Sequence, residues 1–283
     1  MTRSVVAVTG ATGYLGSLFM SAFVDADYDV VALTRREPSA TPHVSWRAYE
    51  LGATPPRDTF EGVDVLVHAA WDLGNSDAQE SWARNVGGSR RLLDAAREAG
   101  VARVVFVSSM SAYFGTRQTY GISKLAVERT VLDGHGVVVR PGLVYGDNAG
   151  GMAGTLTKIA SLPVWPKFGR SALFLAHSDD VATGMVSLVE NYDDFAGRVV
   201  GFAHAERVDL TTILASFAPH GKRHPTVPVP ASLVMSALRL VEATGASLPF
   251  RSDSLLGLVR ATDVLPGQDL LANANIRFRP LAP

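Results

Sequence analysis

Tyr120 and Lys124 lie four residues apart within the segment YGISK. If this segment is helical, the two side chains lie on one face, one above the other. A phenol with a pKa of about 10 exchanges protons poorly at neutral pH, and a nearby ammonium group favours its ionised form. The pair therefore predicts a general acid/base with a pKa lowered toward the working range. Taken alone, the same spacing is at least as typical of an ordinary helix surface.

A second group with chemical potential is the glycine series Gly10, Gly13 and Gly16, which follows the apolar run 5–8 and precedes a helical pattern. Between a strand and a helix, this spacing is typical of a turn that binds the phosphates of a dinucleotide. Gly10 would allow the tight turn, Gly13 the approach of a pyrophosphate, and Gly16 the close packing of helix and strand. The helix N-terminus would add free N–H groups and partial positive charge. A turn that merely tolerates glycine is the alternative.

The end of the second apolar run indicates which dinucleotide is bound. A carboxylate that would bind the ribose hydroxyl of NAD is expected there, but the sequence has Thr34 followed by Arg35 and Arg36. Guanidinium groups form charge-assisted bonds to a 2′-phosphate, which a carboxylate would repel. We therefore expect NADP(H) to be preferred over NAD(H). The alternative is that the two arginines lie in a solvated loop without a ligand. The carboxylate of the neighbouring Glu37 makes the distinction between NADP and NAD less clear.

These residues need elements that place them at one edge, and the first half of the chain supplies an alternating series. Continuous apolar runs are typical of parallel strands that are covered on both faces. The runs lie at 5–8, 29–33, 63–67, 104–107 and 137–139, and helical patterns separate them at 14–26, 81–99 and 120–132. The order predicts an α/β protein with a Rossmann-type, doubly wound parallel sheet.

After Tyr145, glycine and proline interrupt the regular alternation. A helix is expected near residue 180, with Ser178 or Asp179 as its N-cap, and 199–202 is expected to return to the sheet as a strand. We expect a smaller, mostly C-terminal substrate-binding region beside the dinucleotide-binding domain. The predicted ranges are 1–146 with 177–202 for the dinucleotide-binding domain, and 147–176 with 203–283 for the smaller region.

Composition narrows the classes of partner. The 283 residues carry a net charge of −1 and contain no cysteine, which gives no reason to expect nucleic acid and removes cysteine-based metal sites. Capping of a helix explains His177, Asp179 and Asp180 better than metal binding does, so no metal is expected. The sequence has no signal-peptide pattern and no apolar run of about 18 residues. We therefore expect a cytoplasmic protein without a membrane-embedded part.

Taken together, several motifs make the chain resemble the extended short-chain dehydrogenases/reductases, the NAD-dependent epimerase/dehydratase group. The similarity covers about the first two-thirds of the chain. The short spacing between SSMSAY and TYGISK departs from typical nucleotide-sugar enzymes and is similar to members grouped as atypical. The motifs are TGATGYLG at 9–16, VLVHAAW at 65–71, NVGGSRRLLDAA at 85–96, FVSS at 106–109, YGISK at 120–124, RPGLVYG at 140–146 and HSDDVA at 177–182.

The resemblance implies an NAD(P)-dependent oxidoreductase in which Tyr120 is the acid/base, Lys124 holds the nicotinamide ribose and tunes Tyr120, and a serine binds the substrate oxygen. Ser109 takes the serine position when counted forward from the strand, whereas counting back from Gly115 puts Met110 there; Ser111 is the alternative. Further cofactor contacts implied by the resemblance are Thr12, Tyr14, Leu15, Glu50, Leu51, His68, Ala69, Ala70, Asn85, Val107, Ser108, Pro141, Gly142, Leu143 and Val144.

The expected substrate is a small molecule with a carbonyl or a secondary hydroxyl group. Two other functions stay open at this point. A nucleotide-sugar epimerase or dehydratase would use the same groups with a tightly bound cofactor, and a non-catalytic NADP-binding sensor would need no acid/base. Homodimers are common in such families, so a homodimer is compatible with the sequence.

Overall fold

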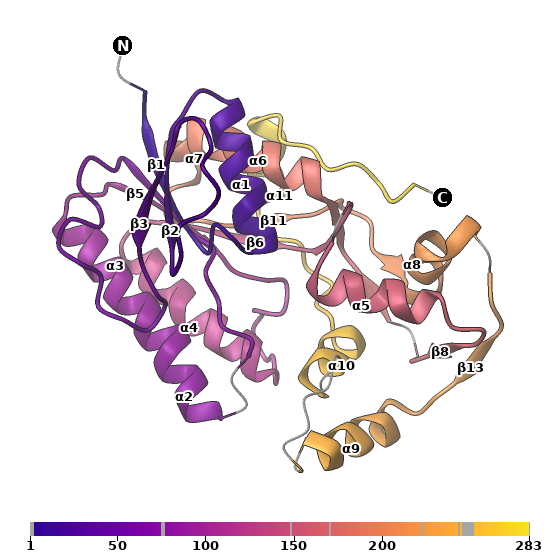
Figure 1. Cartoon of the computed structure of the whole chain (residues 1–283). Helices are drawn as coiled ribbons and strands as arrows, with labels where there is room; N and C mark the ends of the chain where they lie inside the picture. The colour runs from indigo at the N-terminus through magenta and orange to yellow at the C-terminus, as the bar shows by residue number, and fades with distance from the viewer. Residues whose placement is uncertain are drawn as a thin grey trace.

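A seven-stranded, wholly parallel sheet forms the centre of the molecule (Figure 1). The structure, a computed structural model, describes residues 3–74, 77–147, 149–169, 171–221, 223–242, 244 and 252–282. The strand order is β11-β6-β5-β4-β1-β2-β3. The strands are β1 (Val5–Thr9), β2 (Asp29–Thr34), β3 (Val44–Ala48), β4 (Val65–His68), β5 (Arg103–Val107), β6 (Val137–Pro141) and β11 (Val199–Phe202).

Helices cover both faces of this sheet, which is why its central strands are apolar throughout. Val6 and Val8 on β1 point into a core that includes Phe19 of the first helix. Ala7, between them, points into the opposite core together with Leu92. The predicted doubly wound α/β fold is confirmed. The helices are α1 (Tyr14–Asp25), α2 (Ala78–Trp82), α3 (Gly88–Glu98), α4 (Thr119–Asp133), α5 (Gly151–Ala160), α6 (Ser178–Glu190), α7 (Tyr192–Phe195), α8 (Leu210–Phe217), α9 (Ala231–Glu242), α10 (Ser252–Val259) and α11 (Gln268–Asn273).

The main departures from the sequence prediction concern local detail. The helix expected over 81–99 is divided into α2, a π-helical turn at Ala83–Gly87, and α3. Strand β3 was not predicted, because it lies at the sheet edge and none of its five residues is buried. The N-cap of α6 is His177, whose Nδ1 accepts a hydrogen bond from the Asp179 N–H, so Ser178 and Asp179 both lie inside the helix. The predicted return of 199–202 to the sheet is confirmed as β11.

A smaller region packs around a core of its own, beside the carboxyl edge of the sheet. It contains α5, α8, α9 and α10, seen on the right and at the bottom of Figure 1. Trp165 is fully buried in this core, and its Nε1 donates to the Ala160 carbonyl oxygen over 3.1 Å. Short strand pairs complete the region: β7 (Leu143–Tyr145) with β10 (Leu175–His177), β9 (Ala172–Leu173) with β12 (Val208–Asp209), and β8 (Trp165–Lys167) with β13 (Thr226–Pro228).

The last segment of the chain packs on the sheet rather than in the core of the smaller region. Leu271 of α11 and, beyond it, Ile276 and Phe278 are buried in the core that contains α1 and α6. The Arg279 side chain then binds the nearly buried Asp180 carboxylate, with Nε at 2.8 Å from Oδ1. The sequence analysis assigned 203–283 to the smaller region, but Leu271, Ile276 and Phe278 pack in the core beside the sheet. The division of the chain into two regions stays a prediction. Among the described helices, none is long and apolar enough to cross a membrane.

Candidate active site

The turn after β1 has a backbone that only glycine allows at two of its three positions. Gly10 has a φ of +67°, and a Cβ there would lie 2.9 Å from the Ala70 Cα. At Gly16, a Cβ would lie 2.1 Å from the Gly10 carbonyl oxygen, so the first turn of α1 packs directly on the loop. These contacts are those expected for a tight turn and for close packing of helix on strand.

Gly13 is different, because the space beside it is largely open. A Cβ at Gly13 would meet only the Gly10 carbonyl oxygen, at 3.1 Å. Gly13 is the N-cap of α1, and no side chain caps the helix. The first amide groups of α1, from Tyr14 onward, are therefore left to be satisfied by other acceptors. An exposed glycine at an uncapped helix N-terminus fits the pyrophosphate of a dinucleotide, together with the predicted neighbours Thr12 and Leu15.

At the end of β2, the structure separates the predicted residues. Thr34 is buried, and its hydroxyl donates to the Arg36 carbonyl oxygen over 2.6 Å and accepts from Trp46 Nε1 at 3.0 Å. The Thr34 hydroxyl is thus used by the turn itself, and the predicted cofactor contact of Thr34 stays a prediction. The side chains of Arg35 and Arg36 are exposed, and neither forms an ion pair within the described part of the chain.

A cavity of about 290 Å³ lies beside these arginines. Arg35, Tyr49 and the predicted Glu50 are among its lining residues. The Glu50 carboxylate is bound by Arg84 Nη1 at 3.1 Å. Leu51 is half-buried and packs close to α3. The cavity follows β2 and β3, the two strands beyond β1 toward the edge of the sheet, so it lies on the side of the predicted 2′-phosphate contacts.

His68 organises the loop that faces the glycine turn. The Thr9 hydroxyl accepts the N–H groups of Ala69 and Ala70, at 3.1 and 3.0 Å, so its proton goes to His68 Nδ1, 2.7 Å away. His68 Nε2 then donates to the Ser89 hydroxyl over 2.8 Å. Complete burial lowers the pKa of His68 to about 3, so the ring is neutral. Both ring nitrogens of His68 thus have hydrogen-bond partners within the protein. The predicted contact with the cofactor would have to come from the loop that His68 positions, and not from its ring nitrogens.

Tyr120 lies in the first turn of α4, with Lys124 one turn further on. Tyr120 is half-buried, and its side chain is hydrogen-bonded to Ser109, just beyond β5. The Ser109 Oγ also accepts the Ser111 N–H at 3.1 Å. The structure thus brings Tyr120 and Ser109 together, at the carboxyl edge of the sheet. No side-chain contact of Ser111 with Tyr120 is found within the described residues.

Lys124 is buried beside this pair, and its Nζ lies 5.7 Å from the centre of the Tyr120 ring. The Lys124 Nζ donates to the Val107 carbonyl oxygen over 2.7 Å. The same nitrogen lies 3.8 Å from the centre of the Trp71 ring, which is a cation–π distance. Burial lowers the pKa of Lys124 well below its ordinary value, although the Glu128 carboxylate opposes this effect.

The pKa of Tyr120 is raised to about 12, mainly by burial. The hydrogen bond with Ser109 lowers this pKa, whereas the charge of Asp253 raises it. Lys124 is not among the groups that lower this pKa, so the expected effect of the lysine on the phenol stays a prediction. The lysine is itself desolvated, and its amine is directed to Val107 and Trp71, so its charge does not offset the burial of the phenol. At neutral pH Tyr120 is a protonated group that can donate a proton.

Ser108, predicted to contact the cofactor, turns its side chain the other way. Its hydroxyl donates to Glu128 Oε1 over 2.5 Å, inside the protein. Glu128 is 3% exposed and also accepts from Arg140 Nε at 2.8 Å. This buried pair lies one helical turn below Lys124, so it fixes α4 against β6. Ser108 therefore supports the site from behind and does not face a ligand with its hydroxyl.

Asn85 and the segment after β6 complete the same edge. Asn85 is buried in the π-helical turn, where its Oδ1 accepts the Asp72 N–H and its Nδ2 donates to the Asp72 carbonyl oxygen, at 2.8 and 2.9 Å. Its amide is thus committed to the loop after β4, although π-helical turns are common at functional sites. The Pro141 carbonyl oxygen accepts from Met110 N–H at 3.3 Å, so the loops after β5 and β6 touch. Gly142 permits this course, because a Cβ would lie 2.5 Å from the Phe174 carbonyl oxygen. The predicted Leu143 and Val144 follow in β7.

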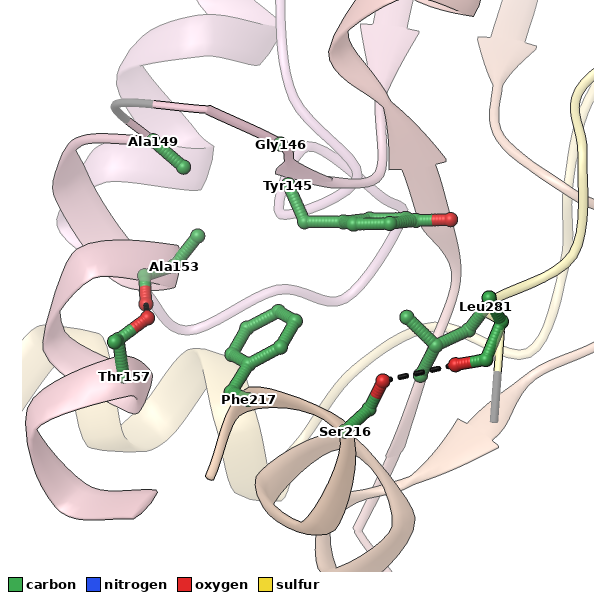
Figure 2. Close-up of a pocket in the computed structure, with 9 residues that line it drawn as sticks. Tyr145, Gly146, Ala149, Ala153, Thr157, Ser216, Phe217 and Leu281 are labelled. Carbon is green, nitrogen blue, oxygen red and sulfur yellow. Dashed lines mark hydrogen bonds between the residues drawn. The ribbon is translucent and has the colours of Figure 1, made fainter. Parts of the chain in front are cut away.

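A separate cavity of about 240 Å³ lies in the smaller region (Figure 2). Tyr145, Phe217 and Leu281 approach it from three segments, and Ala149 and Ala153 line it beside α5. Ser216 holds the C-terminal segment at this wall, donating to the Ala282 carbonyl oxygen over 2.9 Å. The lining is mostly apolar. Neither Tyr120 nor any other residue of the predicted catalytic group lines this cavity.

Three residues of the site were missed by the sequence analysis. Trp71 is the last residue of the quoted motif VLVHAAW, and its position after a strand end could have identified it. Glu128 lies one turn beyond Lys124, on the same face of α4, which was also readable. Asp253 lies in α10, 133 residues beyond Tyr120, and no local pattern connects it to the site.

Comparisons with known proteins identify the family and similar folds. A model of the NAD dependent epimerase/dehydratase family matches residues 6–201. A ceramide reductase from Caulobacter vibrioides is 34% identical over 197 residues, which are 65% of this chain and 61% of that protein. A UDP-glucose 4-epimerase from Streptomyces lividans is 34% identical over 152 residues, 44% of this chain and 45% of that protein. The chain thus spans about three-fifths of the length of the ceramide reductase, and less of the epimerase.

Two further matches concern a ketoreductase and a solved fold. A 4-hydroxy-2-methyl-3-oxo-4-farnesyl-3,4-dihydroquinoline-1-oxide ketoreductase from Stigmatella aurantiaca is 30% identical over 217 residues, 65% of this chain and 64% of that protein. The crystal structure of a protein called gox2253 superposes with a TM-score of 0.77 at 20% identity, covering 99% of this chain and 94% of the other. This structural likeness extends over the smaller region as well as the sheet.

Proposed function

The chain belongs to the NAD dependent epimerase/dehydratase family, and we propose that within it this protein is a reductase that converts a carbonyl group to a hydroxyl group. The observation that carries the proposal is the grouping of Tyr120, Ser109 and Lys124 at the sheet edge that also holds the glycine turn. One relative named a ceramide reductase and another named a ketoreductase support the same direction.

Each of the three residues has a role that its surroundings support. Ser109 is placed to donate a hydrogen bond to the substrate oxygen, beside the Tyr120 phenol. Tyr120, protonated because its pKa is raised to about 12, donates the proton that the reduced oxygen gains. Lys124 lies behind the phenol, with its amine available to a ribose hydroxyl next to the Val107 carbonyl oxygen. These roles follow what the family resemblance implies.

The residues at the glycine turn fit a nicotinamide dinucleotide, which supplies the hydride when it is bound. Gly13 and the uncapped first turn of α1 would hold its pyrophosphate. We extend the proposal to NADP(H) as the preferred cofactor. The exposed Arg35 and Arg36, and the absence of a carboxylate at Thr34, support this preference. A homodimer and a cytoplasmic location stay predictions from the sequence.

An epimerase or dehydratase acting on a nucleotide-linked sugar is the second candidate, because the Streptomyces relative is a UDP-glucose 4-epimerase. In that reaction the hydride is taken and returned, so no net oxidation of the cofactor is seen. A non-catalytic sensor is the third, and the Tyr120–Ser109 contact at the sheet edge argues against it.

The test is a screen that separates these functions. The purified chain is incubated with NADPH or NADH and a panel of ketones and sugar nucleotides, while nicotinamide absorbance and product stereochemistry are followed together. Ketones with long apolar chains are included, because two relatives are named for ceramide and for a farnesyl compound. We expect NADPH consumption with a ketone. A sugar epimer formed without net cofactor consumption would replace the reductase by an epimerase, and NADP(H) binding with no product from any compound would favour the sensor.

A further inference from the structure

Helix α4, which carries Tyr120 and Lys124, has no cap of its own. Its N-cap position is Gln118, and the Gln118 side chain makes no capping hydrogen bond. No acidic residue lies in the first turn of the helix. A helix N-terminus with free N–H groups and partial positive charge needs an acceptor from elsewhere in the protein.

Helix α10 supplies that acceptor. The two carboxylate oxygens of Asp253 accept the backbone N–H groups of Thr119 and Tyr120, at 3.1 and 3.3 Å respectively. The Asp253 carbonyl oxygen accepts from Gln118 Nε2 at 2.7 Å. This is a third hydrogen bond between α10 and the start of α4. Gly257 leaves space for this amide, because a Cβ there would lie 2.6 Å from Gln118 Nε2 and the Gln118 side chain would have to move.

Further contacts show that α10 is firmly seated. The Tyr113 hydroxyl donates to the Arg260 carbonyl oxygen over 2.7 Å, just beyond α10. Leu255 and Leu258 are buried in the core of the smaller region. Asp253 is therefore held between the smaller region and the helix that carries the proposed acid/base.

The Asp253 carboxylate also affects the phenol by its charge. Among the described residues, the charged groups near the Tyr120 ring are Lys124 on α4 and Asp253 on α10, and the uncharged neighbours are Ser109 after β5 and Trp71 after β4. A negative charge favours the protonated phenol, so Asp253 acts in the same direction as burial. Glu128 faces Lys124 from the far side.

We propose that Asp253 is a positioning residue for the reaction: from the smaller region it caps the helix that carries Tyr120 and Lys124, and it fixes the place of Tyr120. The proposal rests on the proposed function of Tyr120. It links the part of the chain that would bind substrate to the group that would donate the proton.

Asp253→Asn and Asp253→Ala separate the two effects, and Asp263→Asn is the control, since Asp263 is an exposed carboxylate ten residues further along. Both Asp253 variants lose the charge, so the alkaline limb of the pH profile for carbonyl reduction should move to lower pH. Asn keeps one acceptor, so Asp253→Ala should show the larger loss of kcat. Unchanged pH profiles in both variants, or an equal shift in Asp263→Asn, would overturn the proposal.

Two readouts do not depend on turnover. Hydrogen exchange of the Thr119 and Tyr120 amides should quicken about fivefold in Asp253→Ala, as expected for the loss of a helix cap. Spectroscopic titration of the phenol, taken as the difference from Tyr120→Phe, should give a lower pKa in Asp253→Asn. If both changes occur in a protein without reductase activity, the proposed function fails while the capping role stands. If neither occurs in an active enzyme, the capping role fails alone.

Discussion

All residues of β4 are buried, whereas none of the twelve residues of α9 is, and Leu233 and Leu240 on α9 are more than half exposed. The central strands of the sheet are covered on both faces, and the glycine turn and the proposed acid/base lie at the carboxyl edge of the sheet. The smaller region is built from helices and short strand pairs, and its helix α10 contacts the N-terminus of α4 through long-range hydrogen bonds. The contrast teaches that the sheet and its glycine turn are determined by local sequence patterns, and the smaller region by contacts between distant segments.

A pair of leucine truncations measures this contrast directly. Leu92 is fully buried in the core beneath the sheet, so Leu92→Ala should lower the free energy of unfolding by about 2–5 kcal/mol. Leu240 on α9 is 73% exposed, so Leu240→Ala should change the free energy of unfolding by less than about 0.5 kcal/mol. Denaturant unfolding of both variants checks this. If the two variants lost the same free energy of unfolding, the Leu240 side chain on α9 would have to be buried in solution, and the contrast would fail.

The glycine turn offers a second comparison, within the cofactor side. Gly16→Ala forces a Cβ onto backbone atoms and should lower the free energy of unfolding by about 1–3 kcal/mol. A Cβ at Gly13 would meet only the Gly10 carbonyl oxygen, at 3.1 Å, so Gly13→Ala should cost less stability than Gly16→Ala while NADPH binding weakens. Calorimetric binding and thermal unfolding are measured for each variant. If Gly13→Ala bound NADPH as tightly as the wild-type protein, the proposal that this turn holds the pyrophosphate would be wrong.

Cofactor preference is tested at the end of β2. Arg35→Glu combined with Arg36→Glu should weaken NADPH binding by about tenfold to a hundredfold, as for lost charge-assisted hydrogen bonds, with a much smaller effect on NADH. Arg198→Glu, at the opposite edge of the sheet, is the control for a change of surface charge. Dissociation constants are compared for both cofactors. Equal weakening of NADPH and NADH would refute the preference for NADP(H).

The pKa of His68 predicts a dependence of stability on pH. Below pH 6.5 the unfolded chain protonates this histidine, whereas the folded chain does so only near a pH of about 3. Stability should therefore fall as pH drops through this window, by up to about 1.4 kcal/mol per pH unit. His68→Gln should remove that part of the slope, and the exposed His135→Asn should not. An unchanged slope in His68→Gln would show that another group accounts for the acid sensitivity.

The features that could be predicted from the sequence lie mostly in the sheet and in the loops at its carboxyl edge. The strands, the glycine turn and the Tyr120–Lys124 spacing are encoded within a few residues, and the fold prediction was confirmed. The edge strand β3 was missed because its exposed residues lack an apolar run. The hydroxyl partners of Ser108 and Thr34 were not foreseen, since no local pattern shows that a buried Glu128 binds the first and a neighbouring turn binds the second.

The electrostatics of the site were harder to foresee than its members. The spacing of Tyr120 and Lys124 indicated attraction between an ammonium and a phenolate, but burial acts on both groups and raises the pKa of the phenol. Asp253 adds to this effect from a helix that begins more than 130 residues later. Depth of burial and contacts at that separation are properties of the assembled chain.

The most direct test of the proposed chemistry is to measure NADPH binding and single-turnover ketone reduction in Tyr120→Phe beside the wild-type protein. We expect the dissociation constant for NADPH to be nearly unchanged and the reduction rate to fall by at least about a hundredfold, as for loss of a general acid. Reduction at the wild-type rate by the phenylalanine variant would show that Tyr120 does not supply the proton.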